Sequence, residues 1–270
     1  MQMKDELVEK IVQEVLKKAG AAAPAAPAAP APAASAEPAG CCSVTEFVGT
    51  GLGDTIGLVI ANVDPALHER MGIDPKFRSI GIFSGRTGAG PQIMAADEAV
   101  KATNTEIVSI ELPRDTKGGA GHGSLIIFGA EEVSDARRAV EVALKELDRT
   151  FGDVYGNDAG HLEFQYTARA SFACNKAFGA PIGKAFGLTV GAPAGIGVVI
   201  ADTAVKAATV DVIGYASPAK GTSLTNEAIL FISGDSGAVR QALIAAREVG
   251  LKLLGTLGAA PASTTGKPYI

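Results

Sequence analysis

The sequence has no tryptophan, few aromatic side chains (5%) and only three cysteines among its 270 residues. The low aromatic content argues against a large ligand cavity walled by rings. Cys41 and Cys42 are adjacent and Cys174 lies far from them, so the cysteines form neither a CxxC pair nor an even disulfide framework. We therefore expect reduced thiols in a reducing cytoplasm, and no metal site built from them.

Charge and long apolar runs are also scarce. Charged residues make up 20% of the chain and the formal net charge is −5, which excludes the strongly basic field of a nucleic-acid-binding protein. No apolar run approaches the ~20 residues that a membrane-spanning helix needs, and the acidic start of the chain lacks the apolar region of a secretory signal. We expect neither nucleic acid nor a membrane as a partner.

Apolar residues are abundant at 47%, and there are 33 glycines, well above a usual share of ~7%. This composition and length suffice for two packed domains. The start of the chain differs, because residues 1–19 carry an amphipathic helix pattern and residues 20–41 form a linker rich in proline and alanine. The helix pattern leaves two interpretations open, a frayed solvated helix or a partner-binding peptide.

An internal repeat determines the domain organisation. The segment 96–102 (ADEAVKA) recurs at 201–207 (ADTAVKA), and matching apolar patterns continue on both sides of it. The period of 105 residues is the size of a domain rather than of a solenoid unit. We predict a tandem duplication, with a first domain over 42–150, a second domain over 151–258 and a C-terminal tail over 259–270.

Each copy has the same predicted order of elements: strand, strand, helix, strand, strand, helix. Asp97 and Glu98 are interpreted as carboxylates at a helix start, where they favour the helix dipole. The order predicts an α/β sandwich in which a mainly antiparallel sheet is covered by two helices on one side. The expected elements are 58–62, 80–84, 93–102, 106–110, 124–128 and 134–148 in the first copy, and 164–169, 187–190, 199–207, 210–215, 228–232 and 237–251 in the second.

No motif assembles into a catalytic or cofactor site. The glycine-rich stretches 51–57 and 179–185 each miss a phosphate-binding pattern by one position, and His68, His122 and His161 are scattered. We therefore predict no enzyme activity, no cofactor and no metal. Glycine loops expose backbone groups that can hydrogen-bond a passing solute. The loops 111–123 and 216–226 are thus candidate pore edges, with plain surface turns as the alternative.

Two stretches, residues 201–215 (ADTAVKAATVDVIGY) and 233–239 (SGDSGAV), resemble the signature of bacterial microcompartment shell domains. The resemblance covers about residues 43–257. Because the strand that is ordinarily last in the family comes first in each copy, it indicates the circularly permuted tandem class. Residues 45–50, 93–117 and 151–158 resemble the shell proteins of propanediol utilisation. The resemblance implies a homotrimer whose six domains form a pseudo-hexagonal tile beside other shell proteins, in a microcompartment shell in the cytoplasm.

The resemblance also implies three groups of functional residues. The tile-edge positions of the family fall on Lys101, Lys206 and Arg169, and Asn62 replaces the arginine in the first copy; a plain solvated lysine is the alternative interpretation. The central pore loops contain Arg114, Lys117, Gly118, Gly121, Lys220, Gly221, Thr222 and Ser223. Smaller channels between the two domains would be lined by Arg86, Thr87, Gly88, Ala89, Gly119, Ala120, His122, Phe151, Tyr155 and Asn157.

A transport and assembly function follows from the resemblance. The channels would pass small polyols such as 1,2-propanediol or glycerol in a compartment for propanediol or glycerol utilisation. The N-terminal helix would bind the encapsulated enzyme core. An alternative is a metabolite-binding sensor module that uses the cleft between the two domains.

Overall fold

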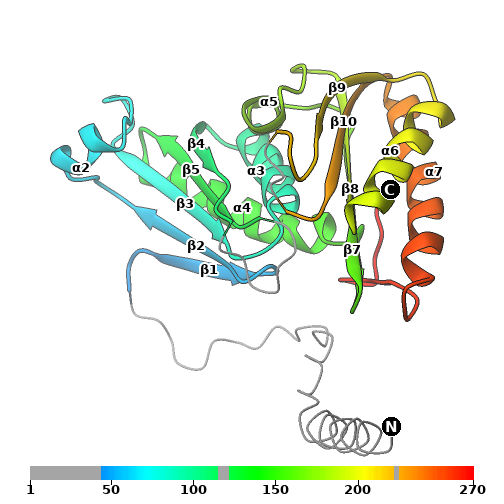
Figure 1. The fold of residues 1–270 in the computed structure, drawn as a ribbon. Helices are drawn as coiled ribbons and strands as arrows, with labels where there is room; N and C mark the ends of the chain where they lie inside the picture. The colour runs from blue at the N-terminus through cyan, green and yellow to red at the C-terminus, as the bar shows by residue number, and fades with distance from the viewer. Residues whose placement is uncertain (1–43, 115–121, 222–224) are drawn as a thin grey trace, which may run out of the picture. The chain divides into compact units, whose positions relative to one another are not determined.

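The computed structural model describes residues 44–114, 122–221 and 225–270. These residues form two antiparallel sheets, one after the other along the chain (Figure 1). Several predictions lie outside the described residues: those for the N-terminal helix and linker, Cys41, Cys42, Lys117, Gly118, Gly119, Ala120, Gly121, Thr222 and Ser223.

The first sheet has the strand order β1-β2-β3-β5-β4. Helix α4 packs on one face of it with α3 alongside, and the short α2 connects β2 to β3. In α4, Ala136, Val140, Ala143 and Leu147 recur at helical spacing and are buried. The elements are β1 (Phe47–Gly51), β2 (Thr55–Ile60), α2 (Pro65–Arg70), β3 (Ser79–Gly85), α3 (Gly90–Ala102), β4 (Glu106–Glu111), β5 (Ser124–Ala130) and α4 (Val133–Thr150).

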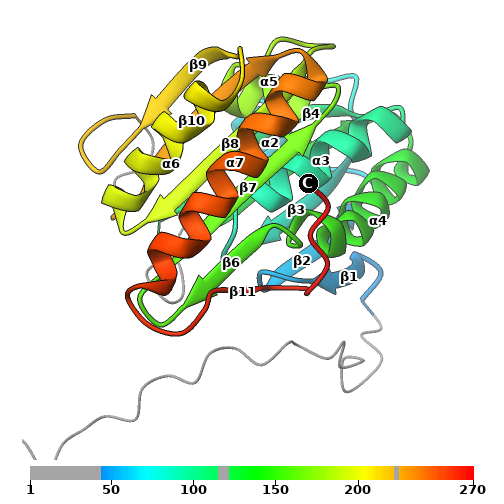
Figure 2. The same cartoon turned by 90° about the vertical axis from the view of Figure 1, so that its right-hand side faces the viewer.

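The second sheet repeats this arrangement in the order β11-β6-β7-β8-β10-β9. Helices α6 and α7 lie side by side on one face of it (Figure 2). This confirms the predicted sandwich of antiparallel sheets and helices. The elements are β6 (Val154–Asn157), β7 (Gly160–Thr167), α5 (Phe172–Phe178), β8 (Ala185–Ala192), α6 (Ala194–Ala207), β9 (Asp211–Ala216), β10 (Ala228–Gly234), α7 (Ser236–Gly255) and β11 (Ala262–Ser263).

Glycines within the strands allow the helices to approach the sheets closely. A Cβ built on Gly81 would lie 2.8 Å from Val140 Cγ2 of α4, and one on Gly187, the matching position of the second sheet, would lie 2.8 Å from Val239 Cγ1 of α7. Such distances leave no room for a side chain. Part of the high glycine content therefore serves helix–sheet packing rather than turns.

The end of the chain is built into the second sheet. Strand β11 pairs with β6, and the buried Asp153 carboxylate accepts hydrogen bonds from the backbone N–H groups of Tyr269 (2.7 Å) and Ile270 (3.0 Å). The same carboxylate pairs with Arg247 of α7 at 2.6 Å. Residues 259–270, predicted as a tail, are thus partly anchored through a shared buried charge.

The repeated helices and central strands lie close to their predicted positions, but several ends differ. Helices α3 and α6 begin at Gly90 and Ala194, several residues before the predicted starts, because glycine and proline near both starts resemble a loop. Proline is tolerated there, since the first turn of a helix has no partner for its N–H. The short elements β1, β6, β11, α2 and α5 were not predicted, as they carry little periodic signal of their own. None of the helices in the described ranges is long and apolar enough to cross a membrane.

The two domains share a small apolar core. Met94 of α3 is buried with Cys174 of α5 and with Phe186 and Leu188 of β8. These strand residues lie on the face of the second sheet opposite α7, because Gly187 between them faces that helix. Helix α5 and the first domain therefore cover the second face of this sheet, and the contact creates the site described next.

Candidate functional site

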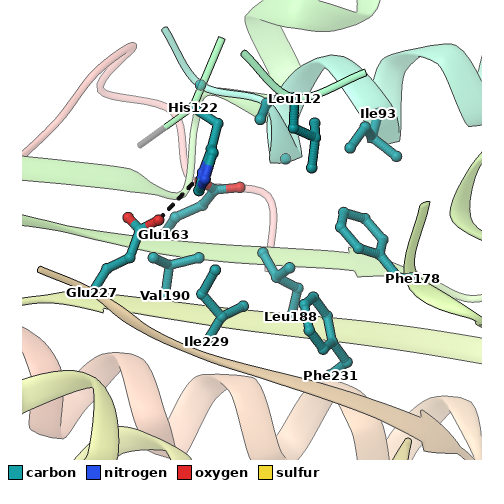
Figure 3. A pocket seen from close by; sticks show the side chains of 13 residues that line it. Ile93, Leu112, His122, Glu163, Phe178, Leu188, Val190, Glu227, Ile229 and Phe231 are labelled. Carbon is teal, nitrogen blue, oxygen red and sulfur yellow. Dashed lines mark ion pairs between the residues drawn. The ribbon is translucent and has the colours of Figure 1, made fainter. Parts of the chain in front are cut away.

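A cavity of about 40 Å³ lies between the two domains. It has room for a few water molecules. One end is polar, with His122, Glu163 and Glu227, and the other is apolar (Figure 3). The lining comes from the start of α3 and the ends of β4 and β5 in the first domain and from β7, α5, β8 and β10 or their ends in the second: Gly88, Ala89, Gly90, Ile93, Leu112, His122, Glu163, Phe178, Leu188, Val190, Glu227, Ile229 and Phe231.

Two histidines hold the carboxylate of Glu227, His122 from the first domain and His161 from the second. His122 Nδ1 lies 3.4 Å from Glu227 Oε1, and His161 Nε2 lies 3.3 Å from Glu227 Oε2. Burial by itself raises the pKa of Glu227, but hydrogen bonds with His122, His161 and Thr225 outweigh it and lower the pKa to about 2. Glu227 is therefore an ionised hydrogen-bond acceptor at neutral pH.

Glu163 is the second carboxyl group of the cavity, and its protonation state is the opposite of that of Glu227. Its residue is only 5% exposed, and within the described chain its Oε1 has no hydrogen-bond partner. Its pKa is raised to about 8, mainly by burial and to a smaller extent by the charge of Glu227, while a hydrogen bond with Gln165 opposes the shift. At neutral pH the group is therefore mostly a protonated carboxylic acid, which can donate a hydrogen bond.

The loop at the start of α3 is shaped around Glu163. A Cβ built on Gly90 would overlap Glu163 Oε1, so only glycine leaves space for this carboxyl group. The preceding Ala89 has a positive φ of 61°, which alanine rarely adopts. Strained backbone of this kind persists only where the surrounding structure enforces it.

The predicted channel residues divide into two groups. Gly88, Ala89 and His122 line the cavity, and His122 is buried rather than solvated. Arg86, Thr87, Phe151, Tyr155 and Asn157 are not among the lining residues, and their channel role stays a prediction. The last three have contacts elsewhere: Phe151 packs in the first core, Tyr155 donates to Asp153, and Asn157 donates to the carbonyls of Leu254 and Ala259.

Sequence analysis missed Glu163 and Glu227. The stretch 161–167 alternates polar and apolar residues, which is typical of a strand with one solvated face. In the structure the polar face of β7 is turned toward the first domain instead. A carboxylate in the middle of such a strand was the available signal, but only the packing of the two domains shows that it is buried.

The predicted tile-edge lysines occupy different surroundings. Lys101 Nζ lies 2.9 Å from both Asp97 and Glu98 and 3.3 Å from Thr167 Oγ1 of the second domain, and its side chain is 25% exposed. Lys206 pairs with Asp202 of the same helix at 2.6 Å, and its side chain is 73% exposed. Thr167 also hydrogen-bonds the backbone of the exposed Arg169. The structure thus brings Lys101 and Arg169 to one place at the domain boundary.

The interpretation of Asp97 as a group at a helix start was wrong. Asp97 lies in the middle of α3 and is fully buried. Its carboxylate accepts hydrogen bonds from the backbone N–H groups of Ser171 (3.0 Å) and Cys174 (3.0 Å), at the start of α5. Ser171 itself makes no side-chain cap. A residue of the first domain therefore caps a helix of the second.

The described members of the central pore loops lie at the surface. Arg114 and Lys220 are exposed, and Lys220 sits in a tight turn in which its N–H and carbonyl both bond to Ser217. Gly221 follows with φ 73°. One chain contributes only part of a central pore, so the pore role of these residues stays a prediction. No cluster of metal-binding side chains occurs in the described ranges.

Two antiparallel sheets of one repeated design lie in two domains with a cavity between them, and the matching helices α3 and α6 each carry a lysine in their last turn. This arrangement defines the class of tandem-domain shell proteins. The BMC domain family matches residues 79–157 and 185–260, and the chain belongs to this family of bacterial microcompartment shell proteins. It is a structural component of a microcompartment shell in the bacterial cytoplasm.

The most informative comparisons cover nearly the whole chain. The bacterial microcompartment shell protein PduB of Citrobacter freundii is 65% identical over 95% of this chain and 96% of its own. The PduB of Salmonella typhimurium (strain LT2) is 66% identical over the same shares. The crystal structure of a trimeric shell protein PduB superimposes with a TM-score of 0.81 and 56% identity, over 84% of this chain and 100% of that one.

The matched ranges also reveal the circular permutation. The first match runs from β3 to the end of β6, yet β6 pairs with β7 in the second sheet. The first sheet is completed instead by β1 and β2, which precede the matched range. In each domain, the strands that come last in the usual order of the family therefore come first along this chain.

Proposed function

We propose that the chain forms a homotrimeric tile of the shell of a propanediol-utilising compartment, and that small polyols cross the tile through the cavity between its two domains. The proposed role is to build the shell and to let small polyols pass through it, and not to catalyse a reaction. The observation that carries the transport proposal is the cavity itself, with a hydrogen-bond donor and an acceptor at one end and apolar side chains at the other. This combination suits a molecule with hydroxyl groups on a short carbon skeleton.

The trimer is supported by an unmatched surface. Within the chain, α3 is covered by α5 and β7 of the second domain. Its repeat counterpart α6 leaves Val198, Val199 and Val205 exposed. On the first domain, the counterpart of α5 is α2, where Leu67 and the C-cap residue Met71 are exposed. If α6 packs against α2 of a second copy as α3 packs against α5, three copies close a ring of six domains.

Such a trimer has polar passages only within each chain. The counterpart of Glu163 in the first sheet is Ile56, because Glu163 pairs with Val190 and Ile56 pairs with the matching Ser84. The boundary between two copies therefore carries an isoleucine where the boundary within a chain carries a carboxyl group. Three polyol passages per trimer follow from this difference. The alternative function, a metabolite-binding sensor module, would use the same cleft between the two domains. No separate observation supports it.

Soaking crystals of the trimer in glycerol tests the transport proposal. We expect electron density for glycerol between Glu163 and Glu227, with a small outward shift of the lining, because the cavity holds only a few water molecules. The control is 1,2-dimethoxyethane, which has as many heavy atoms but no hydroxyl group. Density for neither compound, or equal density for both, would contradict a passage selective for polyols.

The N-terminal segment is proposed to bind the enzyme core. The amphipathic pattern of residues 1–19 and the Pro/Ala linker after it support a tethered peptide. Deleting residues 1–40 should leave shells that close but contain little of the enzyme cargo, as measured by the protein content of purified compartments. A deletion of residues 20–40 alone controls for linker loss. Full cargo in shells that lack residues 1–40 would refute the proposal.

A further inference from the structure

Glu163 and Glu227 face the same cavity but differ in protonation state, and this difference affects which solutes the cavity can bind. Glu227 is held by two histidines, whereas Glu163 Oε1 points into the cavity without a partner in the described chain. Glu163 lies in β7 and Glu227 directly before β10, and Gly90 at the start of α3 in the first domain lies against Glu163. A change in the charge of Glu163 would therefore alter the electrostatic interaction with any molecule in the cavity.

We propose that Glu163 is the selectivity residue of the interdomain passage: its protonated form admits neutral hydroxylic solutes, and its ionised form turns the passage into a site for small cations. This inference rests on the proposed polyol passage and names the group that regulates it. With its proton, Glu163 donates to a hydroxyl oxygen while Glu227 accepts from a hydroxyl hydrogen. Without it, both groups are acceptors and two negative charges share one small cavity.

None of the groups that face Glu163 changes its expected response to pH. His161 comes from the same strand, Glu227 from the start of β10 and His122 from the start of β5, and the two histidines are already engaged with Glu227. Tyr269 hydrogen-bonds to Gln165 at 2.9 Å and carries no charge at neutral pH, because burial raises its pKa well above the usual range. The start of α3 contributes Gly90, Pro91 and Gln92, none of which titrates.

The expected pH range follows from the pKa of Glu163, which burial raises to about 8. An acid whose folded-state pKa is raised stabilises the fold fully below its unfolded value of about 4.5, and this contribution is lost as the pH rises through 8. The neutral fraction falls about tenfold between pH 7 and pH 9. Glycerol affinity should fall by the same factor, and the melting temperature should decrease over the same range.

The test uses the intact trimer, with glycerol as the probe and ligand-observed NMR as the binding measurement at pH 6.5, 7, 8 and 9. The wild type should lose about tenfold in affinity between pH 7 and pH 9, while Glu163→Gln, which keeps a donor but cannot ionise, should bind equally at every pH. Glu163→Ile, which installs the residue of the counterpart position, should bind weakly throughout. The melting temperature of the wild type, but not of Glu163→Gln, should decrease toward pH 9.

The outcomes separate this inference from the function on which it rests. Wild-type binding that does not change with pH, or that changes in parallel with Glu163→Gln, overturns the selectivity role and leaves the polyol passage standing. The absence of glycerol binding in the wild type and in Glu163→Gln at pH 6.5 overturns the passage itself. A melting temperature with the same pH dependence in both proteins shows that Glu163 does not titrate near pH 8 and also overturns the inference.

Discussion

Replacing Val199 by glutamate is expected to leave the chain folded but to prevent it from forming trimers. Val199 is 45% exposed in the single chain. Its counterpart in the first copy is Met94, which is 1% exposed in the core between the two domains, with its sulfur 3.6 Å from Cys174 Sγ. A copy of this interface between chains would bury Val199 in the same way. An unpaired charge there costs on the order of 3 kcal/mol, about a hundredfold in affinity.

Native mass spectrometry and light scattering measure this effect directly. The matched control is Val133→Glu, because Val133 is also an exposed valine but lies at the start of α4, whereas the contacts of α4 with the second domain come from Arg149 and Thr150 at its other end. The control should remain trimeric. A Val199→Glu protein that forms trimers as stable as those of the control would show that α6 does not repeat the contact of α3.

Replacing Asp97 by alanine is expected to destabilise the chain strongly. The substitution leaves two backbone N–H groups at the start of α5 without an acceptor and removes one of the two carboxylates that pair with Lys101 at the domain boundary. A buried hydrogen-bonding group that is left without a partner typically costs about 1–3 kcal/mol. We expect a fall of this size in the free energy of unfolding, measured by chemical denaturation, together with looser contact between the domains.

The repeat provides the control, since Asp202 is the same residue at the matching position of α6. Asp202 makes only an exposed ion pair with Lys206 at helical spacing, so Asp202→Ala should change stability by about 0.5 kcal/mol or less. The helix that corresponds to α5 is α2, and it is already capped by its own Asp64. If the two substitutions had equal effects, Asp97 would not be a cap between domains.

The sequence predicted the regular parts of the fold well, because they depend on local periodicity. The apolar spacing of α4 and the repeated segments of α3 and α6 are visible in one window of the chain, and the duplication identified each element twice. The short α5 was missed for the opposite reason. It has seven residues, and its cap is supplied by Asp97 from the other domain, so no local pattern could identify its start.

The site was only partly predictable. Gly88, Ala89 and His122 were named because their loops match loops of the family, and these three residues do line the cavity. Glu163 was missed because its strand alternates as a solvated strand would. A rule based on alternation places its polar face in water, and only the neighbouring domain turns that face into the wall of a cavity.

By itself, the sequence determined the duplication, the class of fold and the family, since repeat period, side-chain periodicity and motif are properties of neighbouring residues. The tertiary structure alone decided which equivalent residues differ in role. Asp97 and Asp202, Met94 and Val199, and Glu163 and Ile56 occupy matching positions, but within one chain the first member of each pair faces the other domain and the second does not. Burial changes the cost of a charge by several kcal/mol, and burial depends on which surfaces meet in three dimensions.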